Sequence, residues 1–454
     1  MGMKGNLERL RRLAAVLALV AVLALPAGVA AEDFLTLEES IELALRQSVL
    51  IHAAEEGVRA AEALKKEAFT GFLPKLSTSY NYTRLNSEPY TTMPALPPLT
   101  TSPSRLVVGT ENNYAWASEV RQPLFAGGGI LANYEVNRLG YDISLTEKAA
   151  TVHDTIRDVK IAYFNILKAE KLLEVARQSV AQLTSHLNVA RNFFEVGLIP
   201  RNDLLQSEVS LANGELSLSR AENGLELARS RFNTVLRRDI GTPVRIEDIL
   251  AYRPYEKTLE ESIAAALENR PEIRSQTLKV DQARSQVKLA RSDYFPTISA
   301  VGHYERVGDR PGVSGSDFKD AENWYVMGQA SWTFWEWGKT KNRVDAVRSR
   351  ESQTQDLLAN LKDQVKLEVK DAYLLLKEAE KRIQVTQNTI EQARENHRIN
   401  EERYREQVAT STDVLDALTL LTSARSDYAT ALGNYSIDRA RLERAMGVIE
   451  AKNR

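Results

Sequence analysis

The sequence has 454 residues, of which 43% are hydrophobic, a formal net charge of -2 and no cysteine. At about 100–200 residues per domain, this length predicts two or three ordinary domains. The near-neutral charge gives no basic surface for nucleic acid. The absence of cysteine excludes disulfides, thiolate metal sites, cysteine nucleophiles and a lipid anchor on an N-terminal cysteine. The histidines lie far apart in the sequence, without the spacing of metal ligands: His52, His153, His186, His303 and His397.

The N-terminus has the features of a secretory signal peptide. Basic residues between Lys4 and Arg12 precede an apolar run from Leu13 to Leu25, and small residues follow as far as Ala31. This run is shorter than the ~20 apolar residues that a membrane-spanning helix needs, which argues against an anchor. We therefore expect residues 1–31 to be a signal peptide that is removed on export. No later stretch is apolar enough to predict a spanning helix.

The remaining chain repeats itself. The letters Thr-Leu-Glu-Glu-Ser-Ile at Thr36–Ile41 recur at Thr258–Ile263, an offset of 222. Further along the offset is 210, so that Asp203 corresponds to Asp413. The first copy therefore contains a longer loop, which we place in the proline-rich segment 85–112. These correspondences predict a first structural repeat at 32–240, a linker at 241–257, a second structural repeat at 258–447 and a C-terminal tail at 448–454.

Each repeat follows the pattern helix, strand, strand, helix, helix. The first helix opens with a capping box at Thr36 or Thr258 and is predicted to continue to about Thr70 or Asp293, shortly before a proline. The later segments are predicted to be long helices that reverse at 196–200 and 406–412, and helices this polar need an apolar seam against neighbouring helices. Between these helices, alternation with a period of two predicts strands at about 75–84 and 112–124 in the first repeat, and at about 297–306 and 322–335 in the second.

The predicted strands have the pattern of a transmembrane β-barrel. All five tryptophans lie in or beside strands, and large apolar residues alternate with short polar ones, which is typical of barrels with interfacial aromatic girdles. A soluble β-sandwich is the alternative, although four strands are few for one. Two copies of the chain would supply eight strands and three copies twelve, and strand arithmetic alone does not choose between them. The predicted membrane aromatic belt consists of Trp116, Trp324, Trp332, Trp335, Trp337, Tyr82 and Tyr304.

Several motifs together resemble the TolC-type outer membrane efflux family, the outer-membrane factors of tripartite efflux or type I secretion systems. They are the two Thr-Leu-Glu-Glu-Ser-Ile openings, the corner from Gln122 to Gly128, the turn Val196-Gly197-Leu198 and the segment Thr412–Ala417. The resemblance covers essentially the whole chain after the signal peptide. It implies a mainly α fold with a membrane β-barrel portion. In that fold, a homotrimer closes a twelve-stranded barrel from four strands per chain and continues it as a long α-helical barrel.

The resemblance also implies a function and partners. Members of this family are passive outer-membrane channel-tunnels that work with a periplasmic adaptor (membrane fusion) protein and an inner-membrane transporter. We accordingly expect a location in the outer membrane of a Gram-negative bacterium, in contact with outer-membrane lipid and extending into the periplasm, without a lipid anchor. No nucleic-acid partner is expected.

The candidate gate lies at the periplasmic end of the helices. Asp413 and Asp416 are three residues apart at a helix start, so their side chains share a face, and the resemblance matches them to the family's aperture aspartates. Under threefold symmetry they would form a ring of carboxylates that favours cations. The alternative is that Asp413 caps the helix and Asp416 complements its dipole.

Two further residues complete the predicted gate. Asp203 follows the first reversal and could bond a neighbouring helix tip, with Tyr404 either as its partner or as an apolar seam residue. The adaptor-facing helix tips are predicted at Val196, Gly197, Leu198, Val408 and Ala409. The second turn, from Glu406 to Ala409, lacks the glycine of the first.

Other function classes have less support in the sequence. There is no nucleophile motif, metal-ligand cluster or phosphate-binding loop in a supporting context, so neither an enzyme nor a cofactor is expected. The main alternative is a soluble periplasmic coiled-coil adaptor or scaffold protein, since long polar helices suit that role as well. Such a protein would be soluble after signal cleavage, whereas a channel would require detergent.

Overall fold

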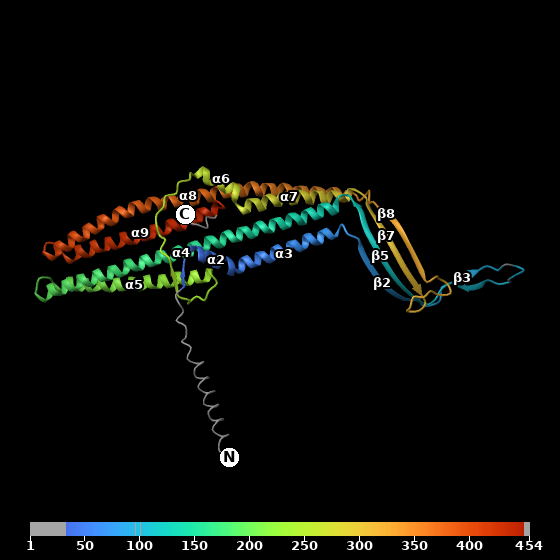
Figure 1. Cartoon of the computed structure of the whole chain (residues 1–454), viewed down its shortest axis with the longest axis horizontal. Coiled ribbons are helices and arrows are strands. Elements are labelled where there is room, and N and C mark those ends of the chain that lie inside the picture. Colours follow the sequence, from blue (N-terminus) through green and yellow to red (C-terminus); the bar gives the residue numbers. More distant parts are fainter. Residues whose placement is uncertain (1–32, 96, 100, 449–454) are drawn as a thin grey trace, which may run out of the picture. The chain divides into compact units, whose positions relative to one another are not determined.

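The computed structural model describes residues 33–95, 97–99 and 101–448, so the predicted signal peptide and residues 449–454 of the predicted tail lie outside the described residues. The chain is mainly helical, with a smaller strand portion (Figure 1). Its elements, in chain order, are β1 (Asp33–Leu35), α2 (Leu37–Gln47), α3 (Val49–Thr70), β2 (Lys75–Arg84), β3 (Tyr90–Met93), β4 (Ser104–Val107), β5 (Asn112–Ala126), α4 (Gly129–Glu195), α5 (Arg201–Val235), β6 (Val244–Ile246), α6 (Leu259–Asn269), α7 (Pro271–Arg291), the 3-10 turn η1 (Ser292–Tyr294), β7 (Thr297–Gly308), β8 (Glu322–Ser331), α8 (Lys339–Arg405) and α9 (Ser411–Ala445).

The chain divides into two compact units, and both are discontinuous in sequence. The helical unit contains residues 33–51, 151–270 and 365–448, and the sheet unit contains residues 52–150 and 271–364. The two long helices α4 and α8 each have 67 residues, and the helices that follow them, α5 and α9, each have 35. Within the described residues, no helix has an apolar stretch long enough to cross a membrane.

The predicted capping boxes are confirmed. The Glu39 amide donates to the Thr36 hydroxyl oxygen at 3.2 Å while the Thr36 amide donates to the Glu39 carboxylate at 2.9 Å. Thr258 and Glu261 form the same pair of bonds, at 3.2 and 2.8 Å. These reciprocal bonds satisfy amides that the first helical turn leaves without partners, which fixes where α2 and α6 begin.

The prediction of one continuous helix before the first strand of each repeat is wrong. Helix α2 is terminated by the C-cap Ser48, whose backbone is extended with ψ 116°, and α6 by the C-cap Arg270, with ψ 123°. Arg270 precedes Pro271, and a residue before proline is disfavoured in the helical conformation. At the equivalent break, the Ser48 hydroxyl accepts the Ile51 amide at 3.3 Å and so supports the start of α3.

The sheet unit contains a four-stranded antiparallel sheet in the order β2-β5-β7-β8 (Figure 1). Strand β8 ends at Ser331, before the expected 335, and β5 continues to Ala126. Every residue of the two outer strands, β2 and β8, is exposed. As the outer members of this order, they each have one edge that pairs with no other strand of the described residues.

The two faces of this sheet differ in chemistry. Residues paired across antiparallel strands share a face, so the pairing of Trp116 with Tyr80 and of Tyr304 with Trp324 puts these aromatics on one side. The opposite side carries polar groups, among them an ion pair between Arg121 and Glu119 at 3.0 Å. The predicted alternation is therefore present in the sheet.

Two strand pairs were not predicted. Strand β1 pairs in parallel with β6 in the helical unit, and β3 pairs with β4 as a hairpin within the long loop of the first repeat. The first pair joins the segment before α2 to the segment after α5. Tyr163 on α4 reinforces it, because its hydroxyl donates to the carbonyl oxygen of Glu247 at 2.8 Å.

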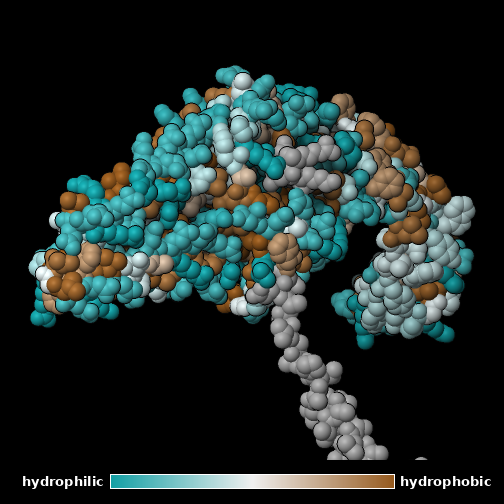
Figure 2. Space-filling model, turned by 60° about the vertical axis from the view of Figure 1, so that its left-hand side comes forward, coloured by the Kyte–Doolittle hydropathy of each residue, from teal (hydrophilic) through white to brown (hydrophobic). Residues whose placement is uncertain are grey.

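The main core lies in the helical unit around this strand pair. Its buried apolar side chains come from α2, α4, α5, β6 and α9, and the largest include Tyr163, Phe232 and Leu236, all with 0% exposure. The surface over the helices is largely hydrophilic but carries apolar patches (Figure 2). Helix α5 exposes four large apolar residues at steps of 4, 7 and 11 residues, which put them on one face of the helix: Leu205, Val209, Leu216 and Leu227.

Candidate functional site

The predicted helix tips are two reversals with the same backbone. In the first, the Leu198 amide donates to the Phe193 carbonyl oxygen at 2.8 Å, and in the second the Val408 amide donates to the Arg403 carbonyl oxygen at 2.8 Å. Gly197 has φ +79°, and Gln407, at the equivalent position, has φ +63°. The second turn therefore adopts without glycine a left-handed conformation that costs a non-glycine residue about 1–2 kcal/mol.

The predicted tip residues are mostly exposed. Val196 is 69% exposed, Leu198 51% and Val408 65%, while Ala409 is half-buried. Three exposed aliphatic side chains therefore lie at the two reversals, at the end of largely polar helices.

Both predicted gate aspartates are exposed in the first turns of α9. The Asp413 carboxylate accepts the Thr410 amide at 2.8 Å, and the Asp413 amide donates to the Thr410 hydroxyl oxygen at 3.3 Å, which forms a capping box. The bond from the Thr410 backbone is the main reason that the pKa of Asp413 lies below its usual value. Thr410 is therefore the N-cap of α9 and Asp413 completes its capping box from the third helical position, while its exposure leaves the carboxylate accessible to ions at the same time.

Asp203 and Tyr404 belong to the same end of the helical unit, but the described residues contain no hydrogen bond between their side chains. Asp203 is half-buried in the first turn of α5. Tyr404 is 3% exposed and packs as a seam residue against His186 and Phe193, with ring centroids 5.1 and 5.5 Å apart. Burial raises the pKa of Tyr404, with Ser411 acting against this shift and the Asp203 carboxylate adding to it.

Sequence reasoning missed a buried polar cluster behind the gate aspartates. The Nε2 atom of His186 on α4 lies 2.8 Å from the hydroxyl oxygen of Ser411 on α9, and this oxygen lies 3.1 Å from that of Ser207 on α5. The exposed fractions are 8% for His186, 0% for Ser411 and 1% for Ser207. The sequence position of His186 could have predicted its burial, because it lies within the apolar seam of Leu183, Leu187 and Ala190.

The predicted aromatic belt falls into two levels. Tyr82, Trp116, Tyr304 and Trp324 lie on the aromatic face of the sheet, where Trp116 and Tyr304 meet edge to face at 5.9 Å. Trp332, Trp335 and Trp337 follow the end of β8 and are 59%, 66% and 87% exposed. The chain between Trp324 and Trp332 is nearly all strand, which at about 3.3 Å per residue separates the levels by roughly 25 Å along the strand. With the tilt of about 35–45° that strands have in outer-membrane barrels, this is roughly 20 Å along the barrel axis, close to the ~25 Å height of their apolar band.

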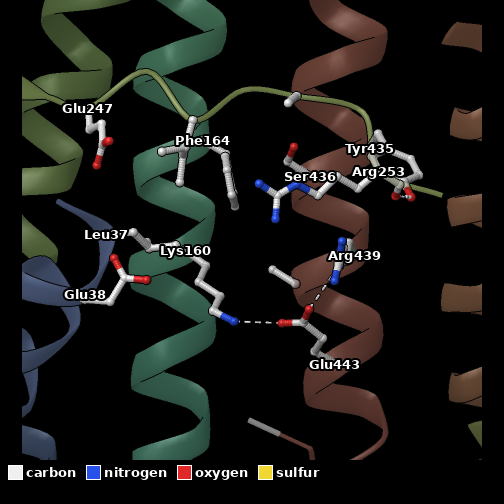
Figure 3. A pocket seen from close by; sticks show the side chains of 13 residues that line it. Leu37, Glu38, Lys160, Phe164, Glu247, Arg253, Tyr435, Ser436, Arg439 and Glu443 are labelled. Atoms are coloured by element: carbon white, nitrogen blue, oxygen red, sulfur yellow. Dashed lines mark hydrogen bonds and ion pairs between the residues drawn. The ribbon is translucent and has the colours of Figure 1, made fainter. Parts of the chain in front are cut away.

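A cavity of about 280 Å³ in the helical unit is the other notable feature. Figure 3 shows Lys160 from α4 and Arg439 from α9 converging on the carboxylate of Glu443, at 2.7 and 3.2 Å. Charges of both signs surround the cavity, with Glu38 and Glu247 on one side and Arg253 on the other. The described part of the chain contains no group of three or more histidine, aspartate or glutamate residues that could hold a metal ion. We interpret this cluster as structural.

Comparisons with known proteins agree with the resemblance in sequence. The model of the outer membrane efflux protein family matches residues 40–236 and 262–448. Protein CyaE of Bordetella pertussis is 23% identical over 208 residues, which cover 45% of this chain and 44% of that protein. Outer membrane protein TolC of Escherichia coli is 21% identical over 336 residues, which cover 68% of this chain and 66% of that protein. The matched regions thus span about half to two thirds of these relatives.

Solved structures show the same fold. The Campylobacter jejuni CmeC outer membrane channel superposes with a TM-score of 0.76 at 17% identity, covering 90% of this chain and 85% of that one. Such low identity establishes the fold alone.

Proposed function

The chain belongs to the outer membrane efflux protein family, and from this membership we propose that it is a channel-tunnel: the passive exit duct of a tripartite efflux or type I secretion assembly, gated at its periplasmic helical end. Family members are outer membrane channel proteins of Gram-negative bacteria rather than enzymes. The match also favours a channel over the alternative of a soluble periplasmic adaptor. The exposed carboxylates of Asp413 and Asp416 beside the second reversal are the observation that carries the gate.

The open sheet supports a homotrimer. Among residues 33–448, where only 96 and 100 are not described, the outer strands β2 and β8 each have an edge with no partner strand, so the sheet can be continued by other copies. Three copies of four strands would form a twelve-stranded barrel, within the size range of outer-membrane barrels. The exposed apolar row on α5 supports the same arrangement for the helices, because a neighbouring copy would bury it.

The chemistry of the sheet supports insertion in the outer membrane. Its aromatic face, with two levels roughly 20 Å apart along the axis of a barrel with tilted strands, would contact lipid, and the face with Arg121 and Glu119 would line a wet lumen. The exposed tips at Val196, Leu198 and Val408 would contact the periplasmic adaptor, which links the duct to an inner-membrane transporter. Co-purification of an adaptor and a transporter with the detergent-extracted chain tests these partners. It also identifies the exported substrate class, which the duct itself does not reveal.

The gate is tested by removing its carboxylates. We expect Asp413→Ala combined with Asp416→Ala to raise single-channel conductance in planar bilayers and to weaken block by multivalent cations, because the ring of negative charge at the constriction is lost. Asp427→Ala is a matched control, since it removes an exposed carboxylate from the same helix about three turns further from the reversal. Unchanged conductance and block in the double variant would remove the gate assignment.

A further inference from the structure

The buried polar cluster at the helix tip joins the element that carries the gate aspartates to two other helices. Ser411 is the first residue of α9 and directly follows the capping residue Thr410. Its side chain is completely buried and contacts His186 on α4 and Ser207 on α5. Burying three polar side chains in an apolar seam costs free energy unless they form hydrogen bonds with one another. Because these bonds form in only one arrangement of the three helices, the cluster favours that arrangement.

The directions of the hydrogen bonds follow from counting donors. The Ser207 hydroxyl donates to the backbone carbonyl oxygen of Asp203 at 3.0 Å, so it has no second proton for Ser411. Ser411 must then donate to Ser207, and its oxygen accepts from the Nε2–H of His186. This order forms one continuous chain, from His186 through Ser411 and Ser207 to Asp203.

We propose that this chain of hydrogen bonds, which we term the tip latch, fixes the first turn of α9 against α4 and α5 and thereby positions Asp413 and Asp416. The inference rests on the proposed gate and adds its positioning residues. Widening of the gate moves the start of α9, and this movement breaks the bonds of Ser411. The latch residues touch neither ion nor substrate and act through the placement of the aspartates.

The surroundings of His186 make the tip latch sensitive to pH. Titratable groups face it from α8, namely His397, Glu401, Tyr404 and Arg405, whereas Asp203 on α5 ends the chain of bonds through its backbone carbonyl oxygen and not through its carboxylate. Helix α9 and the neighbouring turns of α4 contribute Val414, Gln182, Ser185 and Val189, none of which is ionisable. Glu401 is paired with Arg405 at 2.6 Å, so its charge is partly neutralised. Burial lowers the pKa of His186 to about 4, with Glu401 opposing the shift.

The sign of the pH effect follows from proton binding. With the latch closed, His186 has a lowered pKa, whereas in an opened tip that admits water its pKa is the ordinary value of about 6.5. The closed state therefore binds fewer protons, and its stability is complete above about pH 7 and declines as the pH falls toward 4. Between pH 7 and pH 5, these two values predict a rise of about 20-fold in the ratio of open to closed gate. The lowered pKa of His397, which is due first to burial, acts in the same direction and needs its own control.

The test is single-channel recording of the full-length protein in planar bilayers at pH 7.5 and pH 5. Ser411→Ala removes two bonds of the latch, so we expect the ratio of open to closed dwell times at pH 7.5 to rise about tenfold. His186→Gln retains an N–H donor but cannot titrate, so it should keep the neutral-pH dwell times and lose most of the acid response. His397→Gln should retain that response.

Controls separate the latch from the gate and from folding. Each variant is first required to run as an oligomer on an unheated gel, and Ser207→Ala, which removes one bond, replaces Ser411→Ala if the latter does not assemble. The latch would be overturned if the assembled serine variant had wild-type dwell times. It would also be overturned if the acid response disappeared with His397→Gln and persisted with His186→Gln. If Asp413→Ala with Asp416→Ala raises conductance in the same recordings, the gate stands whether or not the latch does.

Discussion

The ion pair between Lys160 and Glu443 gives the most direct test of the packing in the helical unit. Its side chains are 7% and 10% exposed and its atoms are 2.7 Å apart, so both charges have lost most of their hydration. Glu443 also accepts from Arg439 at 3.2 Å, and Arg439 is 27% exposed. The carboxylate therefore has two cationic partners, of which Arg439 has more access to water (Figure 3).

The two single substitutions should lower the free energy of unfolding by different amounts. Glu443→Gln leaves the Lys160 ammonium buried without its carboxylate, and breaking a buried pair in this way costs about 3–5 kcal/mol. Lys160→Met has a smaller cost, about 2–3 kcal/mol, because Glu443 retains Arg439. At roughly 2 cal/mol/K of unfolding entropy per residue, 4 kcal/mol in a chain of this length lowers the Tm by about 4 °C.

The double variant Lys160→Met with Glu443→Leu is the decisive comparison. It replaces both charges by apolar side chains, and such replacements are often neutral, so its Tm should lie within about 1 °C of the parent. Differential scanning calorimetry of the detergent-solubilised protein measures all three variants under one condition. A double variant that is less stable than Glu443→Gln would refute the reasoning, because it would show that losing both charges costs more than leaving the buried Lys160 ammonium without this carboxylate.

Two predictions concern the corners between strand and helix. Gly127→Ala should destabilise the sheet unit by more than Gly128→Ala, although both glycines have positive φ. A Cβ added at Gly127 would lie 2.5 Å from the Ser292 carbonyl oxygen, whereas one added at Gly128 meets nothing within 4 Å. Thermal denaturation measures the order of the two Tm values, and equal values would contradict the prediction. Trp337→Gly should raise stability by about 1–2 kcal/mol by relieving φ +51° yet reduce quenching of tryptophan fluorescence by brominated lipid. Unchanged quenching would remove Trp337 from the belt.

Much of the fold was predictable because local chemistry decides it. The capping boxes at Thr36 and Thr258 follow from a threonine and a glutamate three residues apart. Alternation with a period of two predicts strands β2, β5, β7 and β8, because one face of each meets a different environment from the other. These features need no knowledge of distant contacts.

The missed features depend on contacts between distant segments. The break at Ser48 lacks a proline, and the pairing of β1 with β6 joins residues about 210 positions apart. Strands of three residues carry too little pattern to be recognised. The tip latch was missed for a similar reason, because His186 and Ser411 are separated by 225 residues and only packing brings them together.

The two repeats differ at two equivalent corners where the backbone is left-handed. At an offset of 210, Gly197 corresponds to Gln407 and Gly127 corresponds to Trp337, and all four have positive φ. In both pairs the second repeat places a large side chain in a conformation that costs about 1–2 kcal/mol without glycine. Backbone strain of this kind persists where the side chain has a use that offsets it. Arg237 and Val313 also have positive φ, at +58° and +46°, but only Gln407 and Trp337 replace a glycine of the first repeat at these two corners. These two strained residues therefore lie where the proposed channel would meet other molecules: at the helix tip beside Asp413 and at the proposed membrane interface.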